Sequence, residues 1–556
     1  MPEQNAILLK KIAASAGWHF GLITKKDFED NSPHLTPIKK EFADIAFANN
    51  EKPVDAIYFS GDNPFIHFKH LSNFNPTVVR ELHRKIWNQG RIPFLAIITP
   101  SETRLYDCFD TPVGNDNDLK NLEREFFQNN VEDDLKRLGE LLHQSKIDSG
   151  IIWGKGQLGY KIKTGNRVDR KLVENLKSTR ESLKEKYDLP LDIIHDLLGR
   201  SLFTLYLEDR GILTTKDYPN KLENVNNFFD LLSYPGSTLE LFRFLKEKFN
   251  GDLFPVTPKE EKLIMRFPKC LEAIKNCFTD NIEQLSFNWR LFQFQYIPIE
   301  LISSIYEEFM SEEDEKHFEI IKEKGAYYTP QMLVEFVLNE VLPWPDENNN
   351  GYDLKILDPA CGSGIFLVEC YKRLIARWKY SNKNQNITQS ILEQLLLNNI
   401  YGIEKDSQAI KVTAFSLYLT FLSYLEPKKI LSKVKFNPIV RWKDKNELAE
   451  LKGKKLGNNL FQFSTFTKDL ELLENKFDLI IGNPPWKLGK LDDDVEKYCK
   501  ENKLPQQIIC AYLHFMPKLA PTGIVSLIST AKVLFNTGGG YENFRKKLFT
   551  ENKVDT

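Results

Sequence analysis

The C-terminal part of this sequence is predicted to be an α/β domain built on a doubly wound parallel sheet. Three segments support this prediction. Residues 355–366 combine an apolar strand, a glycine turn and a helix start, residues 400–406 form a strand that ends in an acid, and residues 477–486 form an apolar strand that ends in Asn-Pro-Pro-Trp. Strands that alternate with helices favour a parallel sheet. In such sheets ligands bind beyond the carboxyl ends of the strands, which is where all three motifs fall.

Two further domains are predicted to precede this one, so the 556 residues divide at 1–113, 114–310 and 311–556. The first is expected to be a small α/β domain, because short apolar runs alternate with polar turns. The second is expected to be helical, because apolar residues recur at helical spacing. That helical pattern begins with Leu119, Leu122, Phe126 and Phe127.

Composition narrows the class of protein. With 75 basic and 77 acidic residues the formal charge is −2, so any nucleic-acid surface must come from local basic patches. The seven cysteines show no Cys-x-x-Cys pair and no zinc spacing, so reduced thiols are expected. No segment approaches ~18 uninterrupted apolar residues. The N-terminus also lacks the apolar core of a signal peptide, so we expect a cytoplasmic protein without a membrane span.

The glycine turn at 358–364 reads Asp-Pro-Ala-Cys-Gly-Ser-Gly. Gly362 and Gly364 let the backbone pass close to a ligand at positive φ, and the helix start beyond them presents free N–H groups. Further along the chain, Glu404 stands at the end of a strand, where the diol of a ribose would need a bidentate acceptor. The two features together indicate a nucleotide-type cofactor.

The corner at 483–486 reads Asn-Pro-Pro-Trp. Two consecutive prolines lock φ and supply no N–H, so the strand cannot continue beyond this point. Asn483 can offer its side-chain carbonyl and Pro484 its main-chain carbonyl to one planar NH2 group. Trp486 gives a flat face on which a ring can stack. An exocyclic amine on an aromatic base fits such a corner.

These motifs resemble those of the adenine-specific DNA methyltransferases that methylate amino groups with S-adenosylmethionine. The glycine turn at 358–364 and the corner at 483–486 match the two hallmark motifs of that family. The segment 324–330, Lys-Gly-Ala-Tyr-Tyr-Thr-Pro, resembles the motif that precedes the glycine turn and contacts the methionine part of the cofactor. The order of the motifs resembles the gamma arrangement, and the resemblance is strong from about residue 297 to the end.

The resemblance implies a Rossmann-like S-adenosylmethionine-dependent methyltransferase domain that acts on adenine N6 in DNA. It implies no metal. Chemistry of this kind is mostly positioning, and acceptance of both amine protons would aim the nitrogen lone pair at the methyl carbon. The residues implied for catalysis are Asn483, Pro484, Pro485 and Trp486. The residues implied for cofactor binding are Tyr328, Thr329, Asp358, Ala360, Gly362, Gly364, Glu404 and Asp469.

One position departs from the family pattern. The family usually has an acid near the end of the strand before Asn-Pro-Pro-Trp, and that acid binds the adenine of the cofactor. Here the sequence reads Phe-Ser-Thr-Phe at 463–466, and Asp469 follows only later. Ser464, Thr465 and Asp469 are therefore alternative contacts for the adenine, and Phe466 is a candidate stacking wall.

The first domain resembles in outline the nuclease-like domain found at the front of some restriction-modification proteins. Such a nuclease would need an acid two residues before its lysine to hold a divalent metal. Here His67 occupies that place before Lys69. We therefore expect a domain that does not cleave DNA and serves as a scaffold or contacts DNA.

The expected partners are double-stranded DNA, from which the target adenine is flipped out, and a separate specificity or nuclease subunit. The sheet is expected to be unfinished at residue 556, so a recognition domain would follow or be supplied by a partner. Two alternatives stay open. The chain can methylate another planar amine, of an RNA base or a protein glutamine, or it can be a non-catalytic DNA-binding subunit. For Cys361 a packing role is favoured over that of a nucleophile, because methylation of an amine needs no covalent enzyme intermediate.

Overall fold

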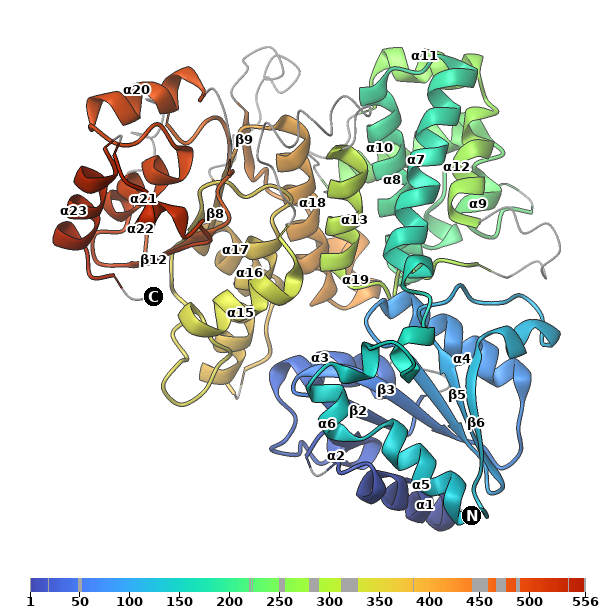
Figure 1. Ribbon diagram of the computed structural model, residues 1–556. Helices are drawn as coiled ribbons and strands as arrows, with labels where there is room; N and C mark the ends of the chain where they lie inside the picture. Colours follow the sequence, from blue (N-terminus) through green and yellow to red (C-terminus); the bar gives the residue numbers. More distant parts are fainter. Residues whose placement is uncertain are drawn as a thin grey trace. The chain divides into compact units, whose positions relative to one another are not determined.

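The structure of the chain is a computed structural model. It describes residues 2–18, 20–48, 53–219, 222, 224–249, 256–279, 290–311, 329–383, 385–442, 459–466, 477–486, 491–538 and 540–554. The chain forms two compact units (Figure 1). The first unit comprises Met1–Glu181 and Glu272–Pro298, and the second comprises Ser182–Leu271 and Ile299–Thr556. This division by compactness differs from the boundaries expected at 113 and 310.

The first unit contains one six-stranded sheet whose strands follow each other in sequence order. Neighbouring strands are antiparallel except for β3 and β4, which are parallel and are connected through α4 (Pro76–Gln89). The strands are β1 (Leu22–Thr24), β2 (Ala56–Ser60), β3 (Asn63–His70), β4 (Phe94–Ile98), β5 (Glu102–Asp107) and β6 (Glu123–Gln128). The other helices are α1 (Pro2–Ser15), α2 (Lys25–Glu29), α3 (Pro37–Ala43), α5 (Glu132–Leu141), α6 (Gln144–Asp148) and most of α7 (Val168–Tyr187).

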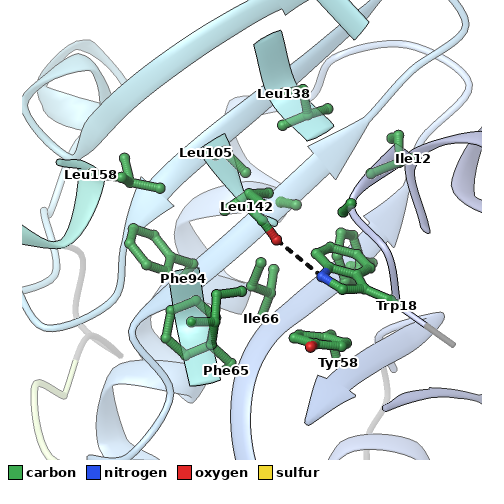
Figure 2. Packing of buried hydrophobic residues seen from close by; sticks show 14 of the residues in the cluster. Ile12, Trp18, Tyr58, Phe65, Ile66, Phe94, Leu105, Leu138, Leu142 and Leu158 are labelled. Atoms are coloured by element: carbon green, nitrogen blue, oxygen red, sulfur yellow. Dashed lines mark hydrogen bonds between the residues drawn. The ribbon is translucent and has the colours of Figure 1, made fainter. Parts of the chain in front are cut away.

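One face of this sheet is covered by an apolar cluster that ties the ends of α1 and α5 together (Figure 2). Trp18 stacks on Tyr58 with 4.2 Å between the ring centroids. The indole N–H of Trp18 donates to the carbonyl of Leu142 at 3.0 Å, so the ring is buried without leaving its polar atom unpaired. The unit therefore has a core of its own, as expected for an α/β domain.

Strand β6 corrects the expectation of helix from residue 114 onward. Leu119 lies in a short 3₁₀ turn, and Phe127 lies in β6, where its side chain is buried. The neighbouring Phe126 is exposed, so the two rings alternate across the strand as a period of two requires. Pairing with β5 overrides the helical spacing of these residues, because strand formation depends on neighbours that a local pattern does not show.

The second unit contains a six-stranded sheet in which every pair of neighbours is parallel. The order is β12-β11-β7-β8-β10-β9, which confirms the doubly wound α/β fold. The strands are β7 (Ile356–Asp358), β8 (Ile400–Glu404), β9 (Val440–Trp442), β10 (Leu460–Gln462), β11 (Leu479–Gly482) and β12 (Ile524–Leu527). The first strand in sequence, β7, lies inside the sheet between β11 and β8, and the edge strand β9 precedes its neighbour β10 along the chain.

Helices connect these strands and also form the segment 182–271. Helix α18 (Ser407–Ser423) is buried along most of its length and packs against α13 (Ile299–Ser311) and α16 (Ile365–Ser381). The others are α8 (Leu191–Asp209), α9 (Phe228–Leu231), α10 (Pro235–Phe249), α11 (Pro258–Arg266), α15 (Gln331–Val341), α17 (Gln389–Asn399), α19 (Pro427–Lys433), α20 (Asp493–Glu501), α21 (Ile508–Leu519), α22 (Lys532–Phe535) and α23 (Tyr541–Glu551). Helix α12 (Cys270–Thr279) begins at the end of the segment 182–271 and lies mostly in the first unit. Of the helices in the described ranges, none combines the length and the apolar character that a membrane crossing requires.

Candidate functional site

The glycine turn and the Asn-Pro-Pro-Trp corner follow two strands that are direct neighbours. Strands β7 and β11 pair in parallel, with Leu479 opposite Ile356 and Ile480 opposite Leu357. From β7 the chain first adds β8 on one side and later adds β11 on the other, so the strand order reverses between them. Such a topological switch point is where doubly wound sheets bind ligands. Both motifs therefore leave the same edge of the sheet at its expected binding position.

The glycine turn is held in place by the neighbouring strand and by α18. The N–H of Cys361 donates to the carbonyl of Ile403 at 2.9 Å, and the hydroxyl of Thr413 donates to the carbonyl of Gly362 at 2.6 Å. Gly364 has φ of 84°, and a Cβ there would lie 2.7 Å from Cγ2 of Thr413. Position 364 therefore requires glycine for both its conformation and its close approach to α18. Immediately after it, α16 begins.

Glu404 ends β8 and contacts the glycine turn directly. Its two carboxylate oxygens accept hydrogen bonds from the N–H of Gly362 at 2.9 Å and from the N–H of Asp406 at 2.8 Å. Burial raises the pKa of this carboxyl group above its usual value, and the two N–H donors oppose that shift. Each oxygen keeps a further lone pair after these bonds. The carboxylate is therefore oriented, and it can still accept two hydroxyl groups from a ribose.

Asp358, the last residue of β7, is buried, and its carboxylate lies against Gly482, the last residue of β11. Its Oδ1 accepts from the N–H of Ala360 at 3.0 Å, and a Cβ added to Gly482 would lie only 2.4 Å from that oxygen. Burial raises the pKa of Asp358 to about 8, the carboxylate of Glu404 adds to the shift, and the Ala360 N–H opposes it. Asp358 therefore links the two motifs, since Gly482 directly precedes Asn483.

The pKa of Asp358 predicts a pH dependence of stability. The folded state keeps this proton up to about pH 8, whereas the unfolded chain releases it near 3.8, so stability is lost as the pH rises between these values. Relative to Asp358→Asn, the wild-type chain should lose about 1.4 kcal/mol of unfolding free energy per pH unit within this window. Denaturant unfolding of both proteins at several pH values measures the difference. Parallel profiles for the two proteins would contradict the prediction.

Asn483 has one end of its amide fixed and the other end free. Its Nδ2 donates to the hydroxyl oxygen of Thr329 at 3.1 Å. Its Oδ1 is buried and has no hydrogen-bond partner within the described part of the chain. A buried carbonyl oxygen without a donor is costly, so it marks a place where a ligand donor is expected. Because Nδ2 is the atom that donates to Thr329, the end of the amide left without a described partner is the acceptor Oδ1.

The rest of the corner follows the sequence expectation in its arrangement. The carbonyl of Gly482 still accepts from Ile528 of the neighbouring segment at 3.0 Å, and the sheet ends there. Pro484 and Pro485 supply no N–H that could extend it. Trp486 is 38% exposed, so part of its ring surface is accessible to a ligand. The corner thus combines a buried acceptor that no described residue satisfies with an accessible aromatic ring.

The end of β10 contributes a hydroxyl and an aromatic ring to the same edge. The hydroxyl of Thr465 donates to the carbonyl of Pro359 in the glycine turn at 2.6 Å, and the hydroxyl of Ser464 donates to Asp494. The ring of Phe466 contacts those of Tyr498 and Tyr512 at centroid distances of 5.2 and 5.0 Å. Both hydroxyl groups that were candidates for the cofactor adenine therefore already donate to groups of the protein.

Two of the predicted site residues, Tyr328 and Asp469, lie outside the described residues, so their roles stay predictions. The structure brings the others together at one sheet edge. It adds Thr413, which sequence reasoning missed, although a buried hydroxyl on the apolar helix α18 was a signal. Cys361 is buried, which raises the pKa of its thiol well above the usual value. Within the described residues, no group of three or more His, Cys, Asp or Glu side chains is placed to hold a metal ion.

Two family models match the C-terminal half of the chain. The model described as N-6 DNA Methylase matches residues 298–445, and the model described as Eco57I restriction-modification methylase matches residues 398–556. The glycine turn falls within the first match and the Asn-Pro-Pro-Trp corner within the second. These matches confirm the resemblance to adenine-specific DNA methylases over residues 298–556.

Two curated relatives each match this chain over only part of their own length. The type II restriction enzyme and methyltransferase RM.Eco57I of Escherichia coli is 26% identical over 339 residues, which are 55% of this chain and 32% of that protein. The adenine-specific methyltransferase BrxX of Escherichia coli O9:H4 (strain HS) is 32% identical over 139 residues, which are 24% of this chain and 11% of that protein. The matches therefore span about a third or less of these two relatives.

Among solved structures, the type IIL restriction-modification enzyme MmeI in complex with DNA is similar to this chain. The two share 17% identity with a TM-score of 0.41, over 68% of this chain and 53% of that chain. The fold is therefore described from the parallel sheet order, and the resemblance to DNA methylases is described from the matches of the two family models.

Proposed function

We propose that the second unit transfers a methyl group from S-adenosylmethionine to the N6 atom of an adenine in DNA, as the modification part of a restriction-modification or phage-defence system. The observation that carries this proposal is the buried Oδ1 of Asn483, which has no hydrogen-bond partner among the described residues and lies at the switch point beside the strand of the glycine turn. An acceptor without a donor fits an exocyclic amine. The matched families and the printed names of the relatives agree with this activity.

The residues present fit the proposed cofactor. Glycine at 364, where a Cβ would collide with Thr413, lets the turn pack closely against α18, and the Glu404 carboxylate is held against the same turn by the N–H of Gly362. Glu404 would accept from the ribose hydroxyls, and the turn at 358–364 would follow the cofactor backbone. S-adenosylmethionine, when bound, supplies a methyl group on a positively charged sulfur. Thr329 and Tyr328 are proposed at its methionine end.

The corner orients the substrate amine. Asn483 Oδ1 and the Pro484 main-chain carbonyl accept hydrogen bonds from the two N–H groups of this amine, so the nitrogen lone pair is directed away from them. Trp486 stacks on the base, which offsets part of the few kcal/mol that flipping an adenine out of the duplex costs. Thr329 is a positioning residue, because its bond to Nδ2 keeps Oδ1 turned toward the amine. The neutral amine is the nucleophile, so no base has to remove a proton before transfer, and the methylated nitrogen afterwards releases its extra proton to water.

The experiment that tests the function offers three acceptors to the purified full-length protein. Duplex DNA, RNA and a protein mixture are each incubated with methyl-labelled S-adenosylmethionine, and hydrolysed products are identified by mass spectrometry. N6-methyldeoxyadenosine in the DNA sample is the expected product. If only RNA or only protein glutamine is labelled, that acceptor and not DNA is the substrate. If none of the three acceptors is labelled, the proposal is overturned. Adding the products of neighbouring genes tests whether a specificity subunit is required.

The first unit is proposed not to cleave DNA. His67, which stands where the nuclease pattern needs an acid, is fully buried, and burial lowers its pKa to about 3, so the ring is neutral. Lys69 donates to the carbonyl of Pro53 at 2.6 Å and pairs with Asp55 at 3.4 Å. Supercoiled plasmid should therefore stay intact with magnesium and the purified protein. If the wild-type protein converts the plasmid to a linear form and Lys69→Ala does not, the first unit cleaves DNA and this proposal is wrong.

A further inference from the structure

The exposed side of α11 carries a row of basic side chains. Residues 256–271 contain four bases and two acids, although the whole chain is close to neutral. All four bases are exposed, and they form what we call the basic face of α11: Lys259, Lys262 and Arg266 on the helix, and Lys269 in the turn that follows it. A helix repeats every 3.6 residues, so the three helical bases lie on one side. The opposite side, with Ile264, is buried.

The two acids of this segment do not offset the charge of the basic face. Glu260 is 1% exposed and accepts from the guanidinium group of Arg200 in α8. Glu261 pairs with Arg243 of α10, with 2.8 Å between Oε1 and Nη2. Each acid is thus matched by an arginine of a neighbouring helix. No acid among the described residues forms an ion pair with any of the four exposed bases, so the basic face keeps its positive charge.

Contacts through α8 show where α11 lies relative to the candidate site. Helix α18 begins three residues after Glu404, and Lys411 in its second turn pairs with Asp196 of α8 at 3.8 Å. One turn further along α8, Arg200 holds Glu260 at the start of α11. Helix α8 therefore connects α11 to the end of α18 that adjoins the carboxyl edge of the sheet (Figure 1). Packed helices lie about 8–10 Å apart, so α11 is about 20 Å from α18.

The basic face matches the charge pattern of a nucleic-acid backbone. Lys259 and Arg266 are seven positions apart, which is about 10 Å along a helix axis. One strand of duplex DNA carries a phosphate about every 3.4 Å along its axis, so the basic face can reach about three phosphates. Because the chain has almost no net charge, a surface for nucleic acid has to come from such a local group of bases.

We propose that the basic face of α11 binds the phosphate backbone of the duplex DNA substrate, on the flank of the target adenine. This inference rests on the proposed function and adds a second contact area for the same substrate. A duplex that extends about 20 Å from the site toward α11 covers about six base pairs. Contacts to phosphate carry no sequence information, so the four bases retain and position the duplex without selecting the methylated sequence.

The test replaces all four bases by glutamine in the full-length protein: Lys259→Gln, Lys262→Gln, Arg266→Gln and Lys269→Gln. Binding of a fluorescent duplex of about 40 base pairs is measured by anisotropy at several salt concentrations. The variant should bind about 10- to 100-fold more weakly than wild type. Its plot of log K against log salt should be less steep by about 3, because about one unit of slope is lost with each phosphate contact.

Steady-state methylation of the same duplex distinguishes substrate binding from chemistry. The glutamine variant should have a KM for DNA that is raised about 10- to 100-fold, whereas kcat at saturating DNA stays within about twofold of wild type. The affinity for S-adenosylhomocysteine should not change. A fall in kcat with an unchanged KM would show that the basic face acts on the structure of the site and does not bind the DNA.

Two control variants have matched substitutions. Replacing four exposed lysines beyond the other end of α18 by glutamine changes the net charge by the same amount and should leave DNA binding unchanged; these are Lys428, Lys429, Lys433 and Lys435. A variant that exchanges lysine and arginine at all four positions of the basic face should bind DNA as wild type does. If the fourfold glutamine variant melts at a markedly lower temperature, Lys262→Gln with Arg266→Gln replaces it, and half the change in slope is expected.

The outcomes distinguish this inference from the proposed function. If wild type does not methylate duplex DNA, the proposed function itself fails. If wild type methylates DNA and the glutamine variant keeps the same salt slope and KM, the function stands and the inference about α11 is wrong. Equal weakening in the control with the lysines beyond α18 would also overturn it, because total charge would then explain the effect. Loss of RNA binding with unchanged DNA binding would overturn duplex DNA as the partner.

Discussion

Replacing Asn483 by alanine should reduce methyl transfer about 10²- to 10³-fold or more, while the affinity for S-adenosylhomocysteine stays within about threefold. The expected loss is in the chemical step, because Oδ1 is the buried acceptor that holds the substrate amine and orients its lone pair. Single-turnover rates with duplex DNA and labelled S-adenosylmethionine measure the first quantity. Calorimetry with S-adenosylhomocysteine measures the second.

Two variants control for the Asn483 result. Asn386→Ala removes an exposed amide in the same unit and should leave the rate unchanged. Thr329→Val removes the acceptor that holds Nδ2, so the amide can rotate and the rate should fall by about tenfold, less than in Asn483→Ala. If Asn483→Ala transfers methyl groups at the wild-type rate, the corner does not hold the substrate, and a non-catalytic role becomes the better account.

Replacing Glu404 by alanine should weaken binding of S-adenosylhomocysteine about 10²-fold or more. The carboxylate would lose its bonds to the ribose hydroxyls, each worth about 1.5–3 kcal/mol when one partner is charged. The substitution would also remove the acceptor of the Gly362 N–H, so the glycine turn loses one of the hydrogen bonds that fix it. Calorimetric titration of the folded variant gives the dissociation constant.

Conservative variants show whether the effect comes from the carboxylate itself. Glu404→Gln keeps one carbonyl acceptor and nearly the same shape, so an intermediate loss of about tenfold is expected. Glu340→Gln makes the same change on an exposed residue at the end of α15 and should bind as wild type does. Equal affinities for wild type and Glu404→Ala would show that this acid does not hold the ribose.

Much of the second unit could be predicted because its local patterns are consistent with its fold. The strands after which the three motifs were placed are β7, β8 and β11 of one parallel sheet. Short apolar strands that end in glycine, an acid or proline are local signals. These signals define the residue at which each strand ends. In a parallel sheet the carboxyl ends of all strands lie at the same edge.

The contacts that complete the site could not be read from the sequence, because they join residues far apart along the chain. Thr329 and Asn483 are separated by 154 positions, and Thr413 and Gly362 by 51. No periodic pattern of either residue indicates its partner. Strand β6 was missed for a related reason, since its pairing with β5 rather than its own spacing decides its conformation.

A structure with sinefungin bound tests the central claim most directly. This analogue of S-adenosylmethionine carries an amine in the place of the reactive methyl group. We predict that it lies along the turn at 358–364, and that its amine faces Oδ1 of Asn483 within about 3–4 Å, because the methyl group must reach an amine that Oδ1 holds by a hydrogen bond. An analogue bound elsewhere, or one whose amine points away from Asn483 so that no methyl group can pass directly, would contradict the account.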